Sequence, residues 1–199
     1  MTAAREGPGR AGLALLLLAA AVASSCRSDR RWQDLRQEPA AALTAPEVDR
    51  MLAERGFFDA HRNPRGSGVA HRYRLLDGGQ VVADDATGLQ WQRGGSPGRR
   101  TLEGARDYVS GLRRGALGGF SDWRLPTLEE AMSLTEPTRS DGGLHLDPIF
   151  GDETWLMWTA DRESLVAPWV VYLDGGTCLV HVPMGGSAHV RAVRSQRER

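Results

Sequence analysis

Residues 119–127 are Gly-Phe-Ser-Asp-Trp-Arg-Leu-Pro-Thr, and this stretch decides the fold of the chain. It brings together an aromatic side chain, an acid and an arginine just before Pro126, which interrupts extended structure. Thr127 and Glu130 stand at the spacing of a capping box, so we expect a helix to begin here. The stretch is therefore predicted to join extended structure to a helix, and it indicates no particular reaction.

Two charged residues flank Trp123 in this stretch. On an extended chain Asp122 and Arg124 point to the side opposite Trp123, because side chains alternate along a strand. We interpret the two as a buried or half-buried ion pair that locks the joint.

Hydrophobic spacing predicts two main helices and several short strands in the same domain. One helix covers residues 101–114, and the other starts at Thr127 and ends before Pro137. A further helix is expected between Thr44, which stands at capping-box spacing from a glutamate, and Gly56. The expected strands are residues 71–76, 80–83, 89–93, 155–160, 169–173, 177–182 and 190–193.

Helices set among short antiparallel strands define an α+β domain of about 150 residues. A chain of that size buries roughly 68–70% of its unfolded surface, so it can fold without disulfides. The turn at residues 174–176 is expected to join two strands as a hairpin. Cys178 lies in an apolar run and is predicted to be a buried structural cysteine. A bridge between two chains is the alternative.

Residues 1–25 are typical of a bacterial lipoprotein signal peptide. A basic start precedes an apolar run at residues 13–23, which is shorter than the roughly 20 residues needed to span a bilayer. The sequence Ala-Ser-Ser-Cys that follows resembles a lipobox, so Cys26 is the predicted lipidation site. The alternative is ordinary cleavage after Ala23, which leaves Cys26 as a plain thiol.

The predicted anchor places the protein in a bacterial cell envelope, in contact with the membrane through Cys26. Arg27, and not aspartate, follows the cysteine, which favours the outer membrane. The expected organisation is a signal peptide (1–25), a lipidated cysteine with a flexible tether (26–43), an N-terminal helix and lead-in strand (44–79), the main domain (80–195) and a tail (196–199).

Composition bears on the class of partner. Every basic residue is arginine, and removal of residues 1–25 leaves 23 Arg against 24 Asp plus Glu, a formal charge of −1. A nearly neutral chain has no general attraction for nucleic acid. We therefore expect no nucleic-acid partner.

Four segments, in their order and spacing, resemble the Lcl C-terminal domain family, named for the end domain of a Legionella collagen-like adhesin. The resemblance covers about residues 80–195 and implies a C-type-lectin-like fold related to the formylglycine-generating enzyme domain. It also implies a secreted or lipidated binding domain, because the adhesin binds sulfated glycosaminoglycans through its own copy. The four segments are residues 87–92, 119–127, 158–159 with 169–171, and 190–194.

Within these segments the recurring side chains are expected to have structural roles. Family members often carry cysteines where this chain has Val109 and Ala192, and a methionine where it has Gln90. These departures indicate a divergent member that has lost a cross-link. The residues assigned to the fold are Trp91, Asp122, Trp123, Arg124, Pro126, Trp158, Trp169 and Arg191.

Patterns that would carry catalysis or a metal are weak. Residues 94–98 fit Gly-x-Ser-x-Gly, but Pro97 has no N–H to offer an oxyanion hole, so a turn is predicted. Enzymes of the formylglycine-generating fold act through paired cysteines, whereas Cys178 is the domain's single thiol. The histidines lack zinc-site spacing, and residues 59–63 and 136–138 lack the ligand pattern of calcium loops. We assign no catalytic residue, cofactor or metal ligand.

We expect a non-enzymatic binding module that recognises a glycan or another envelope component. A structural envelope lipoprotein and an enzyme of the formylglycine-generating fold are the alternatives. The ligand site is expected on the loops at residues 94–100 and 139–155. Trp155 lies outside the recurring segments and is the tryptophan most expected at the surface. The identity of the ligand is not specified by the sequence.

Overall fold

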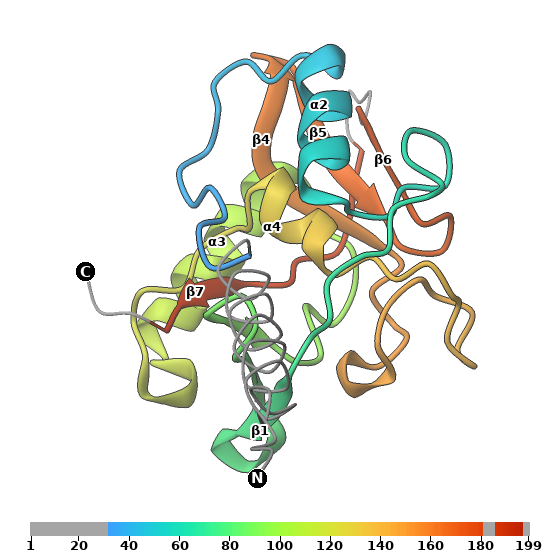
Figure 1. The fold of residues 1–199 in the computed structure, drawn as a ribbon. Helices are drawn as coiled ribbons and strands as arrows, with labels where there is room; N and C mark the ends of the chain where they lie inside the picture. The colour runs from blue at the N-terminus through green and yellow to red at the C-terminus, as the bar shows by residue number, and fades with distance from the viewer. Residues whose placement is uncertain (1–31, 181–185, 197–199) are drawn as a thin grey trace, which may run out of the picture.

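A computed structural model describes residues 32–180 and 186–196 (Figure 1). The signal peptide, Cys26, the last three residues and His181, expected on the solvent face of a strand, lie outside this part. Among the residues that the structure describes, no helix is long and apolar enough to cross a bilayer. The α-helices are α2 (Ala45–Arg55), α3 (Leu102–Arg114) and α4 (Leu128–Ser133), and the strands are β1 (Tyr73–Leu76), β2 (Val81–Asp84), β3 (Leu89–Gln92), β4 (Leu156–Ser164), β5 (Ala167–Tyr172), β6 (Thr177–Val180) and β7 (Val193–Ser195).

Two antiparallel sheets confirm the α+β class. One has the strand order β1-β2-β3-β7, and the other has the order β4-β5-β6. The expected hairpin at residues 174–176 joins β5 to β6, with Tyr172 opposite Thr177. Gly176 has a φ of 61°, a conformation that glycine adopts without strain. The last strand starts later than expected, at Val193, and Val190 and Ala192 before it accept single hydrogen bonds from the N–H groups of Ser96 and Gln92.

The stretch at residues 119–127 joins the two sheets. Arg124 pairs with Val193 of β7, and the carbonyl of Pro126 accepts a hydrogen bond of 2.7 Å from Ala160 of β4. Thr127 then caps α4: its hydroxyl accepts from the Glu130 N–H at 3.2 Å, and the Glu130 carboxylate accepts from the Thr127 N–H at 2.9 Å. The predicted capping box is confirmed.

The charged residues of this stretch do not pair with each other, which corrects our interpretation of the joint. Asp122 instead accepts from Nε of Arg194 at 2.6 Å. Arg124 forms two hydrogen bonds, of 2.7 and 2.6 Å, to the carboxylate of Glu130. Asp122 and Arg124 lie on the same side of the extended chain, as side chains at i and i+2 do. Each nevertheless pairs with an oppositely charged group on another element, Arg194 of β7 or Glu130 of α4.

The core divides into two hydrophobic clusters. Trp91 and Trp169 lie in the larger cluster, which α2 and α4 cover. Trp123 lies in the second cluster, where its Nε1 donates to the carbonyl of Leu117 at 2.9 Å. Val109 and Ala192, the positions at which family members often carry cysteines, lie together in this second cluster. Both positions are thus filled by buried apolar side chains.

Residues 32–43, which we call the strap, are not a flexible tether, so this part of the predicted tether was wrong. Trp32 and Leu35 are buried in the larger cluster. In Figure 1 the strap, in blue, runs up to the start of α2. Leu43 donates its N–H to Arg162 at 2.7 Å and accepts from Nε1 of Trp169 at 2.8 Å. The composition of this segment, rich in Gln and Ala, did not indicate that Trp32 and Leu35 are buried, because their partners are distant in the sequence.

Candidate ligand-binding site

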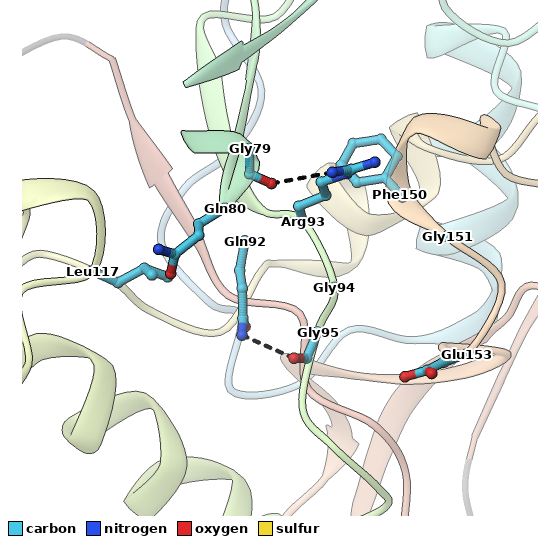
Figure 2. A pocket seen from close by; sticks show the side chains of 10 residues that line it. All are labelled: Gly79, Gln80, Gln92, Arg93, Gly94, Gly95, Leu117, Phe150, Gly151 and Glu153. Carbon is cyan, nitrogen blue, oxygen red and sulfur yellow. Dashed lines mark hydrogen bonds between the residues drawn. The ribbon is translucent and has the colours of Figure 1, made fainter. Parts of the chain in front are cut away.

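The two loops expected to carry the ligand site meet at an open pocket of about 480 Å³, which we call the loop pocket (Figure 2). One wall comes from the segment after β3 and the opposite wall from the segment before β4. The pocket is bordered by Gly79, Gln80, Gln92, Arg93, Gly94, Gly95, Leu117, Phe150, Gly151 and Glu153.

Hydrogen bonds hold the walls of the loop pocket in place. Nε of Arg93 donates to the carbonyl of Ile149 at 2.7 Å, which ties one wall to the other. Nε2 of Gln92 donates to the carbonyl of Gly95 at 2.9 Å, as Figure 2 shows. Gly95 has a φ of 70°, and a Cβ there would meet Oγ1 of Thr154 at 2.5 Å. Glycine is therefore required where the loop crosses the segment before β4.

Arg191, a residue of the recurring segments, lies behind this pocket with its side chain fully buried. Its guanidinium donates to the carbonyls of Gln92 and Arg93 in one wall and to that of Phe150 in the other, and it stacks on the Phe150 ring at 4.8 Å. Burial lowers the pKa of Arg191 to about 9, so the group stays charged at neutral pH. Among the described residues no carboxylate pairs with it. Arg191 thus fastens both walls and places a positive charge behind the pocket.

An aromatic surface adjoins the loop pocket. Trp155, two residues beyond Glu153, is 36% exposed, as expected from the sequence. The Arg99 guanidinium lies 5.4 Å from the centre of its ring, and Tyr172 meets it edge to face at 5.9 Å. We call Arg99, Trp155 and Tyr172 the Trp155 platform. It offers a partly exposed ring beside polar and charged groups.

Two buried polar atoms lie close to the Trp155 platform. Oγ1 of Thr154 and Nδ1 of His189 have no hydrogen-bond partner among the described residues. His189 also meets Trp155 edge to face at 6.3 Å. Burial lowers the pKa of His189, which keeps its imidazole neutral at physiological pH. These atoms are hydrogen-bonding groups that the sequence offered no pattern to identify.

The tryptophans of the recurring segments cannot contact a ligand in this structure. Trp91, Trp123, Trp158 and Trp169 are at most 1% exposed, and Pro126 is buried as well. Their positions agree with the structural roles expected for them. Within residues 80–194, the recurring segments carry the four buried tryptophans, and Trp155, which lies outside them, is the exposed one.

The serine of the Gly-x-Ser-x-Gly pattern and the single thiol of the domain are occupied or inaccessible. The Ser96 hydroxyl donates to Gly98 at 2.7 Å and accepts from the Val190 N–H at 3.0 Å, so it closes a turn. Cys178 is 3% exposed, and burial raises the pKa of its thiol. A bridge from Cys178 to a second chain is incompatible with that burial. Asp59 accepts from the N–H groups of His61 and Arg62 at 2.9 Å, which makes residues 59–63 a turn as predicted.

A second hollow of about 820 Å³ lies beside the outer part of residues 119–127, and the sequence did not suggest it. Its guanidinium groups already have partners. Arg194 is paired with Asp122, and Arg124 with Glu130, while Nε of Arg113 donates to the carbonyl of Trp123. The loop pocket, with its adjoining ring face, is therefore the stronger candidate for ligand binding.

The fold and the site together define a small α+β domain with a ligand site built from loops. A scan against protein-family models matches the Lcl C-terminal domain at residues 80–194, and the chain belongs to this family. Membership makes it, at the coarse level, an adhesin-like binding module. Searches of curated proteins and of solved structures found no match. The strap, α2 and β1 precede the matched region.

Proposed function

We propose that this protein is a non-enzymatic binding module, anchored in the bacterial envelope, that recognises a glycan or envelope polymer at the Trp155 platform and the loop pocket. The observation that carries the proposal is the partly exposed Trp155 ring, which follows Glu153 of the loop pocket by two residues. A planar aromatic face stacks on the apolar face of a sugar ring, while neighbouring polar groups fix its orientation.

The surroundings of Trp155 support this proposal. The ring is held edge-on by Tyr172, whose hydroxyl donates to Asp174 at 2.9 Å. Arg139 in turn donates to Asp174 at 3.0 Å. A preorganised ring loses little conformational entropy when a ligand binds, which favours affinity. Arg99, which lies against the ring, and Glu153, two residues before Trp155, supply charged groups for specificity.

The envelope location rests on the lipobox-like sequence that ends at Cys26. Each buried methylene contributes about 0.8 kcal/mol, so one acyl chain binds reversibly and several hold a protein on the bilayer. We propose that the acylated Cys26 anchors the chain in the outer membrane. Incorporation of an alkyne palmitate analogue, compared with Cys26→Ala, tests this anchor. Equal labelling of the two proteins would exclude lipidation at Cys26.

A glycan and envelope-polymer array tests the binding function. The protein should comprise residues 32–199, because the strap belongs to the folded domain. We expect one class of polymer to bind, and Trp155→Ala to weaken binding at least about tenfold, the factor that corresponds to 1.4 kcal/mol. Leu165→Ala is the matched control, since Leu165 is 84% exposed and lies on the turn between β4 and β5.

Four results would count against this proposal. If no polymer binds, the alternative of a structural lipoprotein gains support. If Leu165→Ala weakens binding as much as Trp155→Ala does, the Trp155 platform is not the site. If Trp155→Ala also lowers the melting temperature strongly, loss of binding reflects loss of fold. Turnover of an array component would favour the enzyme alternative.

A further inference from the structure

The strap is tied to the domain through one buried carboxylate. Asp161 of β4 is fully buried, and its oxygens lie 2.8 and 2.6 Å from Nη1 and Nη2 of Arg36. The same carboxylate accepts from the N–H groups of Ala40 and Leu128, both at 2.6 Å. Two of these partners belong to the strap and one to the first turn of α4. Without the strap, Asp161 would be a buried charge that lacks its cation.

Further contacts hold the beginning of the strap. The hydroxyl of Thr127 donates to the carbonyl of Arg36 at 2.7 Å, and Arg55 of α2 donates to the carbonyl of Asp34 at 2.9 Å. Trp32, the first described residue, is only 9% exposed. The docked region therefore extends to the very start of the described chain.

Docking of the strap limits the distance between the domain and a lipid anchor at Cys26. Only residues 27–31 separate Cys26 from Trp32. An extended chain spans at most about 3.3–3.6 Å per residue, so the two residues lie no more than about 20 Å apart. If the whole region up to Thr44 were free, as the sequence suggested, the tether could reach about 60 Å.

We propose that docking of the strap leaves only a short link between the lipidated Cys26 and the domain, and that this link holds the domain against the bilayer surface. We call residues 27–31, which form this link, the leash. The side that faces the lipid is the one on which the strap begins. It includes Trp32 and the neighbouring Arg55 of α2, which donates to the carbonyl of Asp34. Residues 27–31 include three arginines and one aspartate, which favours an anionic headgroup surface. This side of the domain therefore contacts the membrane that carries the anchor. The protein must then bind its ligands close to that membrane.

This inference rests on the proposed anchor at Cys26, and energy transfer to the bilayer tests it. The lipidated chain is placed in vesicles of phosphatidylethanolamine and phosphatidylglycerol that contain a rhodamine lipid. The donor dye is attached at Asp141→Cys, an exposed position, while the buried Cys178 stays unlabelled. The decisive variant carries an insertion of about twelve Gly and Ser residues between Arg31 and Trp32.

We expect the insertion to lower energy transfer clearly, because it lengthens a short leash several-fold. Arg36→Ala should lower transfer as well, since it releases the strap. The same insertion between Leu165 and Val166, at the exposed turn of β4 and β5, is the control and should leave transfer unchanged. Equal transfer from the native chain and the chain with the lengthened leash would overturn the inference, because a tether that is already long gains little.

Failure of the anchor has a different signature in this experiment. Flotation with vesicles, compared between the native chain and Cys26→Ala, reports on the lipid anchor alone. If the native chain does not float, the anchor is wrong and the inference falls with it. If it floats and the insertion has no effect, the anchor stands and the short leash is wrong.

Discussion

Asp84, at the end of β2, is a fully buried carboxylate with four hydrogen-bond donors. It accepts from Nδ1 of His71 at 2.8 Å, from the hydroxyl of Thr87 at 2.6 Å, and from two backbone N–H groups. Burial alone would raise the pKa of Asp84, but the hydrogen bonds from His71 and Thr87 outweigh it and lower the pKa. The carboxylate therefore stabilises the fold only while it is ionised.

The lowered pKa of Asp84 predicts acid sensitivity. Its contribution is present above the unfolded-state pKa of about 3.9 and is lost as the pH falls through the lower, folded-state pKa. We expect the free energy of unfolding to fall below about pH 4. Asp84→Asn should be less stable at pH 7 and less sensitive to acid. Urea unfolding at several pH values measures this, and parallel pH profiles for the two proteins would contradict it.

Trp123 is the core residue of the stretch that joins the two sheets. It is fully buried, and its Nε1 already has a backbone acceptor. We expect Trp123→Ala to lower the free energy of unfolding by about 3–5 kcal/mol through loss of packing and formation of a cavity. Trp155→Ala, at a half-exposed position, should cost much less. Equal losses in chemical denaturation would show that burial does not distinguish the two roles.

At the scale of elements, Thr127 serves α4 and the strap together. Its hydroxyl accepts from the N–H of Glu130 and donates to the carbonyl of Arg36. We expect Thr127→Ala to cost about 1–2 kcal/mol, more than an exposed helix cap, while Thr127→Ser keeps both bonds and most of the stability. Thermal unfolding checks the order of the three proteins. A serine variant as unstable as the alanine variant would assign the effect to the methyl group.

The ion pair between the strap and β4 can be tested in the same way. Arg36→Ala leaves the buried Asp161 without its cation, so we expect a loss of about 3 kcal/mol or more. Arg74→Ala, which removes an exposed pair with Asp85, is the control and should cost less than about 1 kcal/mol. Chemical denaturation measures both. Equal small losses would mean that the strap contributes little to stability.

At the scale of the whole molecule, Cys178 reports on opening of the fold. Its thiol is buried beside Asp59 and Arg62, and burial raises its pKa. A thiol reagent should therefore react only when the domain unfolds, at a rate that rises with urea. Deletion of the strap should accelerate labelling of the native-state protein. Labelling within seconds in the absence of denaturant would contradict the buried position.

Local patterns explain how much of the molecule could be predicted from the sequence. The predicted capping residues Thr44 and Thr127 each precede a helix in the structure. The turn at residues 174–176 forms the expected hairpin. These signals act over a few residues, where helix geometry and turn conformation are set by the chain itself. Element ends were less certain: β4 runs on to Ser164, beyond the alternation that indicated it.

The amino-acid sequence by itself determined the α+β class, the family, the helix starts and which of the five tryptophans within residues 80–194 is exposed. Only the tertiary structure decided that Asp122 pairs with Arg194, that the strap docks on Asp161, and that Arg191 fastens both walls of the loop pocket. The physical reason is distance along the chain. A buried charge selects whichever opposite charge or polar group the packing brings within about 3 Å, and no local periodicity encodes that choice.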